Sequence, residues 1–119
     1  MGPLDPATLT SLRELDPGGT RGLLPRLIEA FDRTVQRQGA ELEAAMASGP
    51  DLARLGRVAH TLKSASAHLA AQSVSAQCLA LERLCANGDA AQVPSAVAAL
   101  RHGLLEAQDA LHGLVAASP

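Results

Sequence analysis

The sequence predicts an all-α fold, an antiparallel up-down-up-down four-helix bundle with a short N-terminal capping helix. Apolar residues make up 47% of the chain and aromatic residues only 1%, a composition that favours helix packing over a β-sheet. Apolar residues also recur at steps of three and four, the period of a helix that buries one face. With 119 residues, the chain has room for one core and not for a second domain.

A short helix is predicted over residues 4–15, and a long helix follows it. Asp5 is placed to cap the first helix, Pro6 suits its first position, and Asp-Pro-Gly-Gly at 16–19 ends it. The long helix begins near Leu24 and continues to the Ser-Gly-Pro break at residues 48–50. Its predicted inward residues are Leu24, Leu27, Ile28, Phe31, Val35, Leu42, Ala45 and Met46.

Three further helices are predicted over residues 51–69, over 73–86 and from about 93 onward. Asn-Gly at 87–88 ends the middle one. Their predicted inward residues are Leu52, Leu55, Val58, Ala59, Leu62, Ser66 and Leu69, then Val74, Cys78, Leu81 and Cys85, then Val97, Leu100, Leu104, Ala107, Leu111 and Val115. The short connections force consecutive helices to run antiparallel, so we expect one domain over residues 4–117.

Charge and cysteine usage exclude several classes of function. A formal net charge of −2 and the lack of aromatic platforms argue against binding to nucleic acid. Cys78 and Cys85 stand without a CxxC or Cys/His cluster, so we interpret them as reduced packing residues. No apolar run reaches the length of a membrane span and no signal peptide is recognisable, so we expect a cytoplasmic protein that does not bind membranes.

The outer face of the helix predicted over 51–69 carries the candidate reactive group. His60 projects away from the apolar stripe of that helix, toward solvent. Its neighbours on the same face are all small: Ala53, Gly56, Ser64 and Ala67. Lys63 lies three residues after His60 and Arg57 three residues before it, within reach of an anion on the ring. An accessible imidazole between cations suits a phosphoryl carrier.

The following helix is expected to bring a carboxylate to this imidazole. In a helical hairpin that turns near Ala71, His60 and Glu82 each lie eleven positions from the turn and therefore face one another. A ring N–H that donates to Glu82 would fix the tautomer, so the other nitrogen would present its lone pair as a nucleophile at neutral pH.

The residues around His60 resemble the signature of histidine phosphotransfer (HPt) domains. Residues 59–71 read AHTLKSASAHLAA, and the family's signature is roughly His-x-Leu-Lys-Gly-Ser-Ser-x-x-Leu-Gly. The later Cys78 and Leu81-Glu82, the Leu-Asp-Pro start and Phe31 are also similar to the family. Two positions depart from the pattern: Ser64 and Ala70 stand where the family has glycine. We expect Ser64 to tune transfer rate or partner choice.

The resemblance implies that His60 is phosphorylated, that Lys63 steadies the phosphoryl oxygens and that Glu82 orients the ring. It implies receiver domains of response regulators and hybrid sensor histidine kinases as partners. They would dock over Gly56, Arg57, Ser64 and Ala67 and would supply the acceptor aspartate and Mg²⁺. The sequence has no Gly-rich phosphate loop and no acidic cluster, so we expect a phosphoryl carrier without cofactor, metal site or kinase activity of its own. We expect this self-contained bundle to be a monomer.

Two other interpretations of the sequence remain open. The histidine could belong to the dimerisation helices of a histidine kinase, although Thr61 and Ser64-Ala65 do not match the acidic residue and proline typical of that class. Alternatively, the chain could be a helical adaptor in which His60 is incidental. A two-histidine metal site at His60 and His68 is disfavoured, because on a helix the two side chains diverge by about 80°.

Overall fold

The computed structural model describes residues 4–69 and 71–116, and these residues form helices and no β-strand. The all-α prediction is confirmed. The elements are α1 (Pro6–Glu14), the 3₁₀ turn η1 (Pro17–Gly19), α2 (Leu23–Met46), α3 (Leu52–His68), α4 (Gln72–Ala86), the 3₁₀ turn η2 (Ala90–Gln92) and α5 (Val93–Ala116). Residue 117, the predicted domain end, and Ala70, one of the two departures from the signature, lie outside the described residues.

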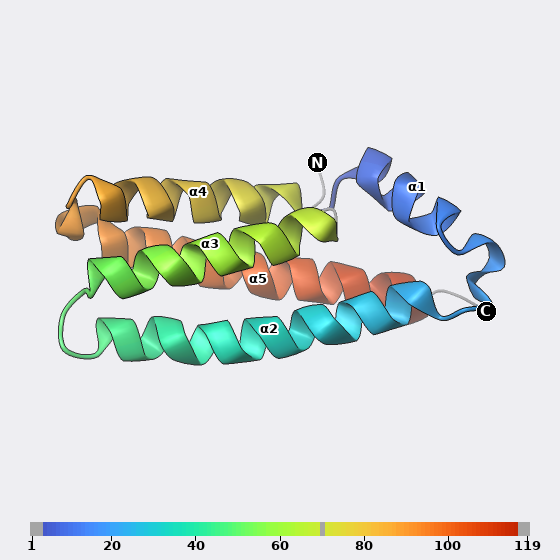
Figure 1. Cartoon of the computed structure of the whole chain (residues 1–119), viewed down its shortest axis with the longest axis horizontal. Coiled ribbons are helices and arrows are strands. Elements are labelled where there is room, and N and C mark those ends of the chain that lie inside the picture. Colours follow the sequence, from blue (N-terminus) through green and yellow to red (C-terminus); the bar gives the residue numbers. More distant parts are fainter. Residues whose placement is uncertain (1–3, 70, 117–119) are drawn as a thin grey trace.

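The four long helices lie alongside one another, and consecutive helices run in opposite directions (Figure 1). The molecule is elongated, with extents of 47 × 23 × 18 Å. Helix α1 lies at the end of the bundle where α2 begins, and it buries none of its own residues completely (Figure 1). Leu4 and Leu12 attach this segment by packing partly against the core.

Capping groups fix several of the helix boundaries. Asp5 accepts a hydrogen bond from the Thr8 backbone N–H at 3.1 Å, as its predicted N-cap position requires. Asp51 accepts from the Arg54 N–H at 3.2 Å in the same way and begins α3. These two acidic residues satisfy N–H groups that have no partner inside the helix.

Helix α2 begins by a different device, which the sequence did not reveal. Its N-cap is Gly22, in a left-handed conformation with φ of 63° and without a side chain that could cap. The buried Asp16 caps the helix instead. Its carboxylate accepts hydrogen bonds from the backbone N–H of Leu23 at 3.0 Å and of Arg21 at 3.1 Å. Asp16 therefore ends the first segment and also caps the next helix.

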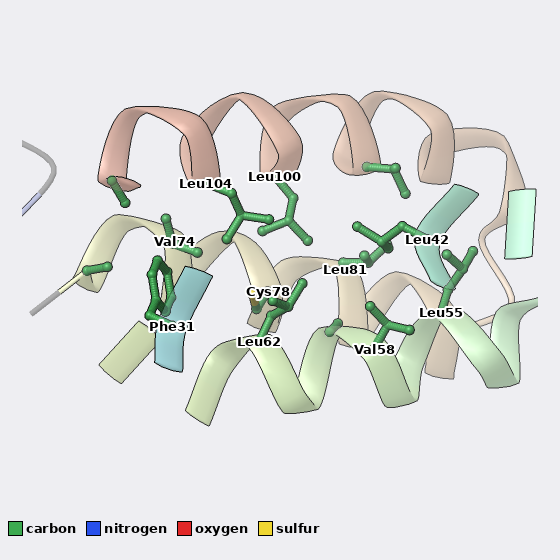
Figure 2. Packing of buried hydrophobic residues seen from close by; sticks show 14 of the residues in the cluster. Phe31, Leu42, Leu55, Val58, Leu62, Val74, Cys78, Leu81, Leu100 and Leu104 are labelled. Carbon is green, nitrogen blue, oxygen red and sulfur yellow. The ribbon is translucent and has the colours of Figure 1, made fainter. Parts of the chain in front are cut away.

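The core consists of apolar side chains from α2, α3, α4 and α5 that meet along the bundle axis (Figure 2). The largest fully buried apolar side chains are Leu42, Leu55, Leu62, Leu81, Leu100, Leu111, Val74, Val93 and Cys78. Most of the predicted inward residues are buried. Exceptions are Leu24, Leu27, Val35, Met46, Leu52, Cys85 and Val115, which are only partly buried.

Both thiols are free, in agreement with the interpretation as reduced cysteines. Burial raises the pKa of the Cys78 thiol to about 12, so Cys78 is a packing residue without nucleophilic character at neutral pH. None of the helices in the described part of the chain is both long and apolar enough to cross a bilayer.

Candidate functional site

Helix α3 presents His60 to solvent. Its buried residues lie on the face opposite to His60, and the His60 side chain is 66% exposed. Of the small residues predicted around the ring, Ala53, Ser64 and Ala67 are exposed and Gly56 is half-buried. The imidazole is therefore open to a macromolecular partner.

Helix α4 brings the Glu82 carboxylate to the ring, as the hairpin geometry predicts. His60 Nδ1 lies 3.4 Å from Glu82 Oε2, and the Glu82 side chain is only 23% exposed. This separation is slightly longer than the usual N–H···O range, so Nδ1 and the carboxylate form a long polar contact. Because Nδ1 faces the carboxylate, Nε2 remains as the free nitrogen, and it makes no polar contact with the described residues.

Lys63 pairs with the same carboxylate. Its Nζ lies 2.6 Å from Glu82 Oε1, so the ammonium and the imidazole of His60 contact different oxygens of one side chain. The Lys63 contact is the main cause that holds the pKa of Glu82 below its ordinary value, and the His60 contact adds to it. Glu82 is therefore ionised at neutral pH and can orient a ring N–H.

A shallow groove of about 660 Å³ lies beside His60, between α3 and α4. It is lined by Leu52, Ala53, Gly56, Arg57, His60, Thr61, Glu82, Cys85 and Ala86. At Gly56 the two helices lie close together, since a Cβ there would be in van der Waals contact with the Cβ of Cys85 at 3.7 Å. The lining is mostly apolar, which suits contact with another protein surface.

The predicted partner-binding residues divide into two groups. Gly56 and Arg57 line the groove, whereas Ser64 and Ala67 lie on the exposed face of α3 outside it. The sequence interpretation missed Leu52, Thr61, Cys85 and Ala86 as groove residues. Those on α4 were detectable in principle, because residues three and four positions after Glu82 share its face of the helix.

The other histidines lie apart from this site. His112 contacts Asp32 at 2.7 Å between α5 and α2, and His102 contacts Glu106 at 3.2 Å within α5. Both side chains are exposed, as is His68 at the end of α3. The described residues contain no group of three or more His, Cys, Asp or Glu side chains that could hold a metal ion.

Comparisons with known proteins give one match. Searches of curated proteins and of solved structures found no significant match. A family model described as the Hpt domain matches residues 26–112, from the first turn of α2 into the last part of α5. This range contains every residue of the groove and all three groups of the His60 contact. The chain therefore belongs to the Hpt domain family, whose members are phosphoryl carriers of two-component signalling and interact there with receiver domains and kinases.

Proposed function

We propose that this protein is a phosphorelay intermediate that carries a phosphoryl group on Nε2 of His60. It accepts the group from the aspartate of one receiver domain and donates it to the aspartate of another. The scaffold that we assign to this role is an up-down-up-down four-helix bundle, with α1 as a cap at one end.

The observation that carries the proposal is the orientation of the His60 ring. An exposed imidazole has one nitrogen toward an ionised carboxylate and the other toward solvent, beside a shallow, mostly apolar groove. Glu82 as an acceptor favours the tautomer with hydrogen on Nδ1, which leaves the Nε2 lone pair as the nucleophile.

On this chain, the transfer step needs the Nε2 nucleophile and the charged carboxylate of Glu82. Nε2 attacks the phosphorus of an aspartyl phosphate, the N–P bond forms, and the P–O bond breaks so that the carboxylate leaves with its electron pair. Nδ1 keeps its proton, and Glu82 stabilises the positive charge that the ring gains. Transfer to the next receiver domain is the reverse of this step, with the new aspartate as the nucleophile.

Lys63 is proposed to stabilise the phosphoryl oxygens once they are attached to the ring. Its ammonium already lies at the site, bound to Glu82 Oε1, and its side chain is 30% exposed. The flexible four-carbon chain of lysine allows the ammonium to turn from the carboxylate toward a phosphoryl group on the same face of α3. Lys63 therefore binds Glu82 before transfer and the phosphoryl oxygens after it.

The partners proposed for the groove are receiver domains of response regulators and of hybrid sensor histidine kinases. They would supply Mg²⁺ and the aspartate, because this chain offers a nucleophile and cations but no acidic cluster for the metal. We further propose that the protein works as a monomer in the cytoplasm without kinase activity of its own.

Transfer of labelled phosphate from a phosphorylated receiver domain tests the proposal. The wild-type protein should become labelled, whereas His60→Gln should take up no label, because the glutamine amide lacks a nucleophilic ring nitrogen. His102→Gln is the matched control, since His102 is also exposed but lies on α5 beside a carboxylate of its own helix. Label on His60→Gln at the wild-type level would remove His60 from the mechanism.

A further inference from the structure

Helices α3 and α4 are joined by a side-chain hydrogen bond that lies outside the His60 contact. Ser75 Oγ on α4 donates to the backbone carbonyl oxygen of Lys63 on α3 at 3.1 Å, in a half-buried position. Among the described residues, no other side-chain hydrogen bond connects these two helices. Their remaining polar links are the two ion pairs made by Glu82.

This bond lies at a matched level of the hairpin. Ala67 and Ser75 each lie four positions from Ala71, just as His60 and Glu82 each lie eleven positions from it. A helical carbonyl points toward the C-terminal end of its helix, so the oxygen of Lys63 points toward the N–H of Ala67, the residue level with Ser75. Ser75 can therefore reach it only while the two helices keep the register that also places Glu82 opposite His60.

The rest of the interface between α3 and α4 is mainly apolar packing, which has no directional hydrogen bond to define the axial position of Glu82. Figure 1 shows the two helices side by side along their length, and the side chains between them are mainly small or aliphatic. The separation of 3.4 Å between His60 Nδ1 and Glu82 Oε2 is already slightly longer than the usual N–H···O range, so any further lengthening would remove Glu82 as a hydrogen-bond acceptor. An axial shift of α4 by about 1.5 Å, the rise of one helical residue, would move Glu82 out of level with His60 and lengthen this contact further.

We propose that Ser75 is a positioning residue for phosphoryl transfer. Its hydrogen bond to the Lys63 carbonyl locks the axial register of α4 against α3, and through that register it holds the Glu82 carboxylate on Nδ1 of His60. This role rests on the proposed function of His60, but the state of the ring can be measured without any transfer. Ser75 touches neither the phosphoryl group nor the imidazole.

The test uses ¹⁵N chemical shifts of the His60 ring, which report its tautomer, together with the rate of phosphoryl uptake. In Ser75→Ala, the ring should shift toward the tautomer with hydrogen on Nε2, the commoner form of an imidazole without an acceptor at Nδ1. The uptake rate should fall by roughly three- to tenfold, the effect of losing about one net hydrogen bond. Ser75→Thr keeps the hydroxyl and should restore both readouts.

Ser73→Ala is the matched control, because Ser73 is an exposed serine on the same helix. The His102 ring on α5 serves as an internal reference, and thermal unfolding checks that each variant is folded. An unchanged His60 tautomer in folded Ser75→Ala would overturn the proposal, as would an equal change in Ser73→Ala. If His60→Gln still takes up label, the proposed function fails, and the tautomer measurement still decides whether Ser75 positions Glu82.

Discussion

Polar side chains in this protein differ in whether they have an ion-pair or hydrogen-bond partner. Glu82 is contacted by both Lys63 and His60, whereas Oγ of the completely buried Ser66 has no hydrogen-bond partner among the described residues. Ser66 lies in the core, as predicted for an inward residue of α3. A buried hydroxyl without a partner costs stability that an apolar side chain would not.

Replacement of Ser66 by alanine tests this assignment. Ser66→Ala should leave the free energy of unfolding unchanged or raise it by up to about 1 kcal/mol, because it removes a desolvated hydroxyl and improves helix propensity. Urea unfolding followed by circular dichroism measures the change, with Ser73→Ala as the exposed control. A loss of more than about 1 kcal/mol would mean that the hydroxyl does make a stabilising hydrogen bond.

Among the helical elements, α4 and α5 fit together through a glycine. A Cβ on Gly103 would lie 2.2 Å from Oε1 of Gln77, so the absence of a side chain on α5 makes room for the amide from α4. This contact accounts for a glycine inside a helix, where it costs about 1 kcal/mol relative to alanine. This contact could not be predicted from the sequence, since Gln77 and Gly103 are on different helices.

We predict that the two positions are coupled. Gly103→Ala alone should destabilise or leave stability nearly unchanged, because the gain in helix propensity is offset by displacement of the Gln77 side chain. In a Gln77→Ala background the same change should stabilise by about 1 kcal/mol. Chemical unfolding of the four proteins gives the double-mutant cycle.

Gly39→Ala is the control for this cycle, because Gly39 is inside α2 and a Cβ there would meet nothing within 4 Å. It should stabilise by about 1 kcal/mol in either background. Equal effects of Gly103→Ala on the free energy of unfolding with and without Gln77 would show that the contact does not affect stability.

On the scale of the whole molecule, several carboxylates that join distant segments have lowered pKa values. The Leu23 N–H lowers the pKa of Asp16, the Arg54 guanidinium that of Glu41, and the Lys63 ammonium that of Glu82. Each of these contacts links two elements: η1 with α2, α2 with α3, and α3 with α4. The ionised carboxylates thus contribute to the assembly of the bundle.

Acid should therefore weaken the fold. In the unfolded chain these groups titrate near pH 4, and in the folded protein they titrate lower, so between the two values the unfolded state binds more protons. Their contribution is complete above the unfolded pKa and is lost as the pH falls through the folded pKa. The midpoint of urea unfolding should be level from pH 7 to about 5 and should decline below about pH 4.

Glu41→Gln provides a control, because it removes one of these groups without a large change in shape. Its unfolding midpoint should lie below that of the wild type at pH 7 and should converge with it in acid. A midpoint that rises as the pH is lowered would contradict the assignment of these pKa shifts.

The sequence alone determined which segments are helical, which faces are buried and where His60 and Glu82 meet. These features follow from the 3.6-residue period and from the short turn near Ala71, which are local properties of the chain. The tertiary structure alone decided that Lys63 binds Glu82, that Asp16 caps a helix seven residues away and that Cys85 lines a groove. Such choices depend on distances between side-chain ends on separate elements, and only the packing of the helices sets those distances.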